Sequence, residues 1–206
     1  MSGARRVVLW RHGQTQWNLE KRFQGGTDIP LTETGMAEAK AAAARLATLQ
    51  PAVIVASDLV RATATADALV EATGRSCAYD PRLRERFGGS WEGLTQAEIR
   101  DAYPAAWEQW QPADGEHEAE VGERVAAAIG DVVADLPAGE LAVVVSHGGA
   151  IRAGIGRVLG LQQPLWRCFG PLSNCAWSVL GESAAGWRLL EHNAGTLPEP
   201  ALSDDR

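Results

Sequence analysis

The chain has 206 residues, with 19 basic and 26 acidic side chains and a formal net charge of −7 at pH 7. Its hydrophobic share of 46% and charged share of 22% are typical of a globular protein and exclude an intrinsically disordered one. No apolar run approaches the roughly 18 residues of a membrane-spanning helix, so we expect no membrane partner. The acidic balance argues against a nucleic-acid partner, because phosphate backbones are bound by clustered Lys and Arg. An anionic ligand would therefore need positive charge concentrated at one place.

The cysteines bear on the cellular compartment. Cys77, Cys168 and Cys175 are an odd number, and none belongs to a Cys-x-x-Cys pair. Such a set is typical of a reducing compartment rather than of a disulfide framework. The apolar run at residues 7–10 is too short for the core of a signal peptide. We therefore expect a cytoplasmic protein.

Three short runs of β-branched and other apolar residues predict the central strands of a sheet. Because these runs are apolar at every position, both of their faces should be covered, which is typical of parallel strands. In chain order we expect a strand at 6–10, a helix at 32–49, a strand at 52–56, helices at 59–73 and 118–136, a strand at 141–145, a helix at about 149–159, and late strands at 174–180 and 187–190. This alternation predicts an α/β fold, a three-layer α/β/α sandwich with a mostly parallel central sheet.

Residues 86–117 interrupt this alternation. The segment contains Trp91, Trp107, Trp110 and several Gly and Pro residues, and we expect a lid-like insertion of short helices and loops over one sheet edge. No repeat or linker divides the chain, so residues 1–206 should form one domain, with a mobile tail at about 195–206. The late strands either offer an edge for a homodimer or simply cover the sheet.

Polar side chains follow each of the three central strands. Arg11 and His12 follow the first, Arg61 comes one helical turn beyond the second, and His147 follows the third. Ligands of open parallel sheets bind beyond the carboxyl ends of the strands. We therefore expect these four side chains to meet at one site.

The residue types at this position suit a phosphoryl group. Arg11 and Arg61 carry permanent charge in a forked geometry that matches phosphoryl oxygens. A protonated His147 would add a third positive charge. Nearby cations favour the neutral form of His12, which is then a nucleophile toward phosphorus.

Two further features fit the same chemistry. A helix that begins near Gly148 would point its positive end at the bound anion. Glu85 lies in a glycine-containing loop and is the candidate proton donor for the leaving oxygen.

Other chemistries lack their signatures. The four histidines, at positions 12, 117, 147 and 192, are too dispersed to predict a zinc site. The sequence contains neither a Gly-x-x-x-x-Gly-Lys-Ser/Thr loop nor a Gly-x-Ser-x-Gly elbow. We therefore expect no metal and no cofactor.

Five blocks of the sequence resemble, in order, the signature of the histidine phosphatase superfamily, also called the phosphoglycerate mutase-like family. They are Arg11-His12-Gly13 with Asn18, Gln24-Gly25-Gly26-Thr27-Asp28, Ser57-Asp58-Leu59 with Arg61, Leu83-Arg84-Glu85 with Trp91-Glu92-Gly93, and Ser146-His147-Gly148-Gly149. A single Arg-His-Gly is weak evidence, whereas five ordered blocks are specific.

The resemblance implies phosphoryl transfer through a phosphohistidine. His12 would be the nucleophile, and Arg11, Arg61 and His147 would form the phosphate pocket. Glu85 would protonate the leaving alcohol and then deprotonate the water that hydrolyses the phosphohistidine. Further phosphate or substrate contacts are expected from Asn18, Gln24, Gly25 and Gly148. Arg84 and Arg86, which flank Glu85, either hold a carboxylated substrate or are solvated loop residues.

The family contains both mutases and phosphatases. Cofactor-dependent phosphoglycerate mutases resemble this chain but carry a longer insertion after the general acid, so the short stretch from Thr95 to Glu116 favours a phosphatase that acts on a small phosphomonoester. The mutase, and a phosphate-binding module without catalysis, are the alternatives.

Within the phosphatase branch, the chain is similar to actinobacterial glucosyl-3-phosphoglycerate phosphatases. That ester, or a broad range of phosphomonoesters, is the substrate that this similarity implies. Many such relatives have Gly-Glu-Ser where this chain has Gly115-Glu116-His117. His117 therefore either contacts the leaving group or is an exposed residue at a helix start.

Overall fold

The structure, a computed structural model, describes residues 4–195 and contains one six-stranded sheet with the order β3-β2-β4-β1-β5-β6. The strands are β1 (Arg6–Arg11), β2 (Val53–Ala56), β3 (Ala78–Tyr79), β4 (Leu141–Ser146), β5 (Trp177–Ser183) and β6 (Gly186–Ala194). Neighbours among β3, β2, β4 and β1 pair in parallel, whereas β5 pairs antiparallel with both β1 and β6. The predicted mostly parallel sheet is confirmed, and the two late strands add an antiparallel edge.

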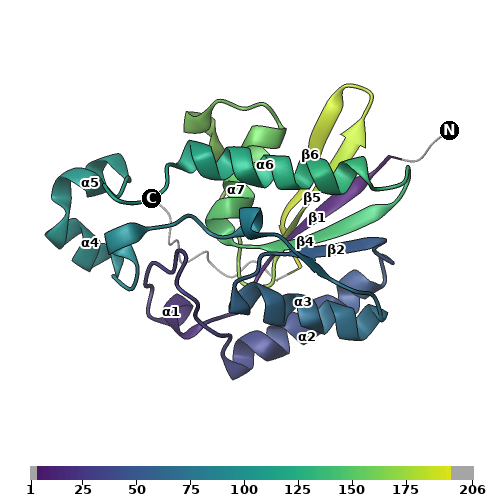
Figure 1. The fold of residues 1–206 in the computed structure, drawn as a ribbon, viewed down its shortest axis with the longest axis horizontal. Helices are drawn as coiled ribbons and strands as arrows, with labels where there is room; N and C mark the ends of the chain where they lie inside the picture. Colours follow the sequence, from purple (N-terminus) through teal and green to yellow (C-terminus); the bar gives the residue numbers. More distant parts are fainter. Residues whose placement is uncertain (1–3, 196–206) are drawn as a thin grey trace.

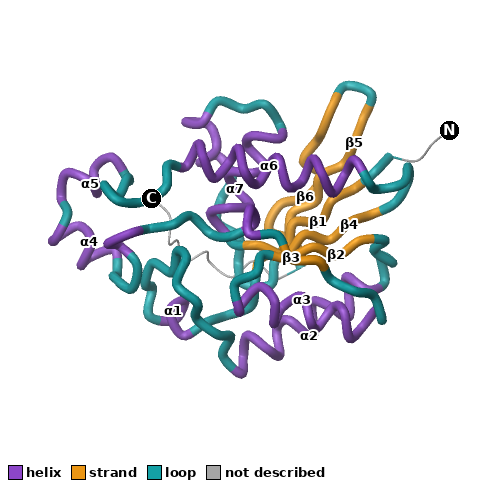
Figure 2. Tube along the Cα trace, in the orientation of Figure 1, coloured by secondary structure: helices purple, strands orange, loops and turns teal. Residues whose placement is uncertain are grey.

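Helices cover both faces of this sheet (Figures 1 and 2). The helices α2 (Glu33–Ala47) and α3 (Val60–Thr73) lie on one face, and α6 (Glu118–Ala134) and α7 (Gly148–Val158) lie on the other. No helix among residues 4–195 is long and apolar enough to cross a membrane. The three-layer α/β/α sandwich predicted from the sequence is therefore confirmed.

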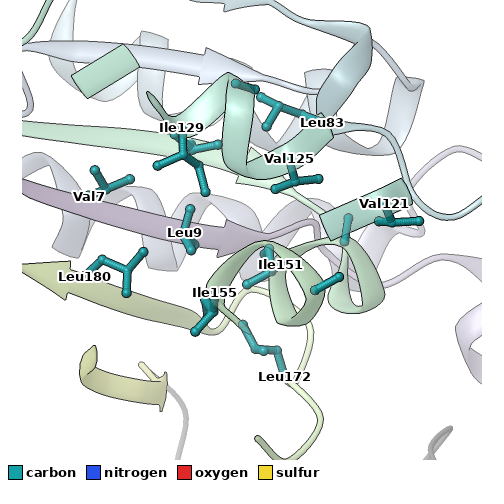
Figure 3. Packing of buried hydrophobic residues seen from close by; sticks show 14 of the residues in the cluster. Val7, Leu9, Leu83, Val121, Val125, Ile129, Ile151, Ile155, Leu172 and Leu180 are labelled. Atoms are coloured by element: carbon teal, nitrogen blue, oxygen red, sulfur yellow. The ribbon is translucent and has the colours of Figure 1, made fainter. Parts of the chain in front are cut away.

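Alternate residues of β1 serve the two faces, because successive side chains of a strand point in opposite directions. Val7 and Leu9 pack in the cluster that contains residues of α6 and α7, and Figure 3 shows them beside Ile129, Ile151 and Ile155. Val8 and Trp10 instead pack in the cluster formed with α2 and α3. All four of these side chains are fully buried, which explains why β1 is apolar at every position between its terminal arginines.

The segment that follows β3 extends beyond the carboxyl ends of the parallel strands. It contains the short 3-10 helices η1 (Pro81–Leu83) and η2 (Gly89–Trp91), followed by the α-helices α4 (Gln96–Ala102) and α5 (Pro104–Gln109). Of these, α4 and α5 lie at the far left of Figure 1. Trp91, Ile99 and Trp107 form a separate buried cluster, against which Phe23 and Trp110 pack. The expected position over one sheet edge was therefore wrong, because these aromatic side chains pack on one another rather than on the sheet.

Two remaining short helices lie near the ends of longer elements. These are α1 (Gln16–Leu19), which follows β1, and the 3-10 helix η3 (Gln163–Cys168), which follows α7. The predicted mobile tail falls almost entirely on residues 196–206, which lie outside the described residues.

Candidate active site

A cavity of about 670 Å³ opens where the carboxyl ends of β1 and β4 meet the loops that follow them. Its wall includes eight of the residues singled out from the sequence: Arg11, His12, Asn18, Gln24, Gly25, Arg61, Glu85 and Gly148. His147 does not line the cavity but lies directly behind His12, with the two ring centroids 5.1 Å apart. Side chains distant in sequence thus converge at the site that the strand ends predicted.

His12 is held as a neutral imidazole with a defined tautomer. Its Nδ1 lies 2.7 Å from the carbonyl oxygen of Gly13, and because a carbonyl only accepts, Nδ1 must carry the hydrogen. The unprotonated nitrogen is then Nε2. Burial and the charges of Arg61 and Arg11 hold the pKa of His12 well below its usual value. His12 is therefore available as a nucleophile at neutral pH.

Arg61 is fully buried, and backbone carbonyls orient its guanidinium group. Nη1 donates to the carbonyl oxygen of Thr27 and Nη2 to that of Gly25, each at 2.8 Å, while Nε donates to Nδ1 of His147 at 3.1 Å. Burial lowers the pKa of Arg61 to about 10, so the group stays charged at neutral pH. These three bonds leave one N–H on each terminal nitrogen for a phosphoryl oxygen.

His147 is the neutral partner of this arginine. Because Arg61 can only donate, Nδ1 of His147 accepts, and its hydrogen lies on Nε2, 2.8 Å from Oγ of Ser57. Burial, followed by the charge of Arg61, holds the pKa of His147 well below its usual value. The third positive charge considered from the sequence is therefore absent here, since burial beside Arg61 disfavours the imidazolium.

Arg11 presents a donor that no group among residues 4–195 satisfies. Its Nη1 donates to the carbonyl oxygen of Leu172, whereas Nε is buried and has no hydrogen-bond partner. The guanidinium lies against Gly148, whose missing side chain leaves room there. A buried N–H is costly to leave unsatisfied, so this position favours an anionic acceptor.

Glu85 is bound at the amino end of α7. Its Oε2 accepts from the N–H of Gly149 at 3.0 Å, and its Oε1 accepts from the N–H groups of Ala150 at 2.9 Å and Arg86 at 2.8 Å. A Cβ on Gly149 would come within 2.8 Å of Oε1, so glycine permits this approach. The positive end of the helix thus holds the carboxylate, in addition to facing the expected anion.

Asn18 and Gln24 brace the loop that follows His12. Oγ1 of Thr15 lies 3.0 Å from both Oδ1 of Asn18 and Oε1 of Gln24. The side chain of Asn174 lies 3.1 Å from the carbonyl oxygen of His12 and 3.2 Å from Oδ1 of Asn18, so it ties the late segment to this loop. Sequence reasoning missed this role of Asn174, and no local pattern signals it.

Besides His147, Arg84 and His117 also lie outside the cavity wall. Arg84 is half-exposed and forms two hydrogen bonds with the carboxylate of Asp58, at 2.7 and 2.6 Å. His117 is the exposed residue before α6, where its N–H donates to Glu120 at 2.8 Å. The structure thus matches the second of the two readings of His117.

Sequence reasoning considered Arg86 for a carboxylated substrate but missed Glu118 and Arg152, which complete a charged part of the wall. Arg86, Glu118 and Arg152 all line the cavity. Arg152 follows Gly149 by three residues, so the helical period alone places it on the face of α7 that Glu85 contacts. Among the described residues, no group of three or more His, Cys, Asp or Glu side chains is arranged to hold a metal ion.

Comparisons with known proteins agree with this geometry. The family model described as "Histidine phosphatase superfamily (branch 1)" matches residues 7–195. The glucosyl-3-phosphoglycerate phosphatase of Mycobacterium tuberculosis is 40% identical over 212 residues, which cover 93% of this chain and 95% of that protein. The probable phosphoglycerate mutase GpmB of an Enterobacter species is 38% identical over 211 residues, covering 96% and 97%.

A solved structure of high similarity is that of mycobacterial glucosyl-3-phosphoglycerate phosphatase in complex with VO3. It superposes with a TM-score of 0.88 and is 39% identical, covering 93% of this chain and all of that one. The likeness therefore spans the sheet, the insertion and the residues of the cavity together.

Proposed function

Because the chain belongs to the histidine phosphatase superfamily, we propose that it hydrolyses phosphomonoesters through a phosphohistidine on His12. The observation that carries this proposal is the tautomer of His12, which leaves Nε2 unprotonated. Arg11, Arg61 and Glu85 line the same cavity. The site therefore combines a nucleophile, two cations and an acid.

The reaction proceeds in two displacements. In the first, Nε2 of His12 attacks phosphorus, the bond from phosphorus to the ester oxygen breaks, and Glu85 gives a proton to that oxygen. In the second, ionised Glu85 takes a proton from water, the water oxygen attacks phosphorus, and the phosphorus–nitrogen bond breaks. Inorganic phosphate leaves, and both His12 and Glu85 return to their starting protonation states. Arg11 and Arg61 stabilise the charge on the phosphoryl oxygens in both steps.

The substrate that we propose is glucosyl-3-phosphoglycerate or a closely related ester. The relatives named for this substrate match 93% of the chain. The cavity is also several times larger than a phosphoryl group requires, and aromatic residues Phe23 and Trp110 lie in its wall together with charged side chains. Such a wall suits a leaving group with both a sugar ring and ionised groups.

The direct test is hydrolysis with trapping of the intermediate. Purified protein should release inorganic phosphate from glucosyl-3-phosphoglycerate, retain this activity in EDTA, and lose it with vanadate. Acid quenching with labelled substrate should leave label on the wild-type protein and none on His12→Ala. Activity that persists in His12→Ala would refute the phosphohistidine.

The same assay separates the two alternatives. A phosphoglycerate mutase, the activity named for some relatives, would interconvert 3- and 2-phosphoglycerate faster than it hydrolyses them and would respond to bisphosphoglycerate. A phosphate-binding module would bind vanadate but form no labelled intermediate. We expect neither result, because the cavity holds a nucleophile and an acid together.

For the setting of the enzyme, we propose the cytoplasm, with a small phosphomonoester rather than nucleic acid as its partner. The edge strand β6 carries Leu190, which is 55% exposed, and this supports the proposal of a homodimer through that edge. Sedimentation velocity should give a dimer, and Leu190→Lys should shift it to monomer. A monomer at all concentrations would exclude this interface.

A further inference from the structure

We propose that Arg152 binds a carboxylate carried by the leaving group, so that the enzyme prefers phosphomonoesters of hydroxy acids. The inference deepens the proposed function and rests on it, because it assigns the part of the cavity beyond the phosphoryl site. Arg152 lines this cavity and is 8% exposed. A buried guanidinium in a ligand cavity offers a planar pair of donors that matches a carboxylate.

The position of Arg152 relative to Glu85 supports the assignment. Glu85 occupies the space where a side chain on Gly149 would begin. Arg152 is three residues further along α7, and side chains one turn apart lie about 5–6 Å from each other on one helix face. Long helical side chains also lean toward the amino end of the helix. The guanidinium of Arg152 therefore extends along the wall toward the carboxylate that protonates the leaving oxygen.

The helix that faces α7 shows that a carboxylate fits this position. Oε1 of Glu118, in the first turn of α6, lies 3.7 Å from Nη2 of Arg152. At this distance the two side chains form an ion pair, but these two atoms are too far apart for a hydrogen bond. Because Arg152 also lines the cavity, the carboxylate of a bound ligand can approach the same guanidinium.

Arg86 adds positive charge to the same region and stays fixed while doing so. Its Nε donates to the carbonyl oxygen of Glu116 at 2.8 Å, and its Nη1 and Nη2 donate to that of Trp110 at 3.1 and 3.2 Å. Burial lowers the pKa of Arg86, with the carboxylate of Glu118 among the groups that oppose this. Arg86 is thus fixed in place and, with Arg152, gives this wall two positive charges beside the carboxylate of Glu118.

The chemistry of glycerate esters fits the spacing. In a 3-phosphoglycerate unit, two carbon atoms separate the ester oxygen from the carboxyl carbon. A leaving oxygen at Glu85 therefore places the carboxylate within reach of a side chain one helical turn away. Glycerol 3-phosphate has the same skeleton with a hydroxymethyl group in place of the carboxylate, and so provides a matched comparison.

The test measures binding without turnover. In the His12→Ala background, calorimetry should show that 3-phosphoglycerate binds about tenfold or more tightly than glycerol 3-phosphate, as a charged hydrogen bond predicts. Adding Arg152→Gln should bring the ratio of the two dissociation constants close to one, and Arg152→Lys should restore part of it. Arg157→Gln is the control, because Arg157 is on the same helix but half-exposed and paired with Glu123. An unchanged ratio in Arg152→Gln would overturn the proposal.

A second variant should change the preference for 3-phosphoglycerate in the opposite direction from Arg152→Gln. Glu118→Gln removes the carboxylate that faces Arg152, so it should tighten the binding of 3-phosphoglycerate relative to glycerol 3-phosphate. An equal or smaller preference would count against the assignment. This variant and Arg152→Lys keep the question open to measurement if Arg152→Gln does not fold.

The proposed function has its own readout. Hydrolysis of p-nitrophenyl phosphate, which has no carboxylate, depends on His12 and reports the proposed reaction without the carboxylate contact. It should be unchanged in the control Arg157→Gln, because Arg157 lies outside the cavity wall. No hydrolysis by the wild-type protein, together with a preserved binding ratio, would reject the proposed reaction and leave the carboxylate site standing. Hydrolysis by the wild-type protein without a preference for 3-phosphoglycerate would support the proposed reaction and reject the carboxylate site.

Discussion

Arg61 donates from Nε to Nδ1 of His147 over 3.1 Å, and this bond decides which nitrogen of His147 carries hydrogen. The result is a site with two neutral imidazoles and two guanidinium groups. The positive charge of the site therefore resides on the guanidinium groups of Arg11 and Arg61. His12 keeps its lone pair on Nε2 because its other nitrogen donates to Gly13.

Replacing Arg61 with lysine should abolish most of the activity. An ammonium group keeps the charge but cannot donate at once to Gly25, Thr27 and His147, so the phosphate pocket and the tautomer of His147 both lose their support. We expect kcat to fall by about 100-fold or more, since such electrostatic groups contribute on that scale. Single-turnover formation of the phosphoenzyme measures this step. Arg75→Lys, an exposed substitution, is the control and should retain full activity.

Stability should fall in mild acid because of the buried histidines. The pKa of both His12 and His147 is lowered in the folded protein, so the unfolded chain binds more protons once the pH drops below about 6.5. The contribution is fully present above that pH and is lost as the pH falls toward the lowered values. Urea unfolding at a series of pH values should show a falling free energy of unfolding below about pH 6.5. His147→Gln should flatten this dependence, whereas His117→Gln, an exposed substitution, should leave it unchanged.

Replacing Glu85 with glutamine should affect substrates according to their leaving groups. An alcohol needs a proton from Glu85, whereas p-nitrophenolate leaves readily without one. We expect phosphoenzyme formation from a sugar-acid phosphate to slow by about 100-fold or more and that from p-nitrophenyl phosphate to slow much less. Rapid-quench measurement of the first turnover distinguishes the two. Equal slowing of both substrates would argue that Glu85 is not the proton donor.

A methyl group on Gly149 should separate activity from stability. The Cβ of Gly149→Ala would come within 2.8 Å of Oε1 of Glu85 and push the carboxylate away from α7. We expect kcat to fall by about tenfold or more, because small displacements of catalytic groups are costly, with no loss of melting temperature. Gly130→Ala, in α6, meets no atom within 4 Å. It should keep full activity and gain about 0.5–1 kcal/mol in the free energy of unfolding.

The central fold could be predicted from the sequence because burial on both faces leaves a clear pattern. Residues 7–10 of β1, all of β2 and residues 141–145 of β4 are apolar, and the helices between these strands carry ordinary start and stop signals. The two-residue strand β3 escaped prediction because its side chains are exposed. The late strand begins at Trp177 rather than 174, since Cys175 takes a positive φ of 57° in the turn before it.

Only the site residues that follow strand ends or belong to motifs could be predicted from the sequence. Strand ends and motifs brought together Arg11, His12, Arg61 and Glu85, which the structure finds in one cavity. The proton position on His147 depends on the direction of a single N–H of Arg61, and no sequence pattern encodes that. Asn174 reaches the cavity through a turn that only the tertiary fold brings there, whereas the spacing of Arg152 from Gly149 could be read from the predicted helix.

The separate buried cluster of Trp91, Ile99 and Trp107 has a consequence for how such enzymes diversify. A segment with its own small core can change sequence without disturbing the packing on either face of the sheet. The wall that contacts the alcohol and the wall that carries His12 are therefore free to evolve at different rates. Exchanging residues 94–111 between relatives should transfer substrate preference while leaving the chemistry of phosphoryl transfer intact.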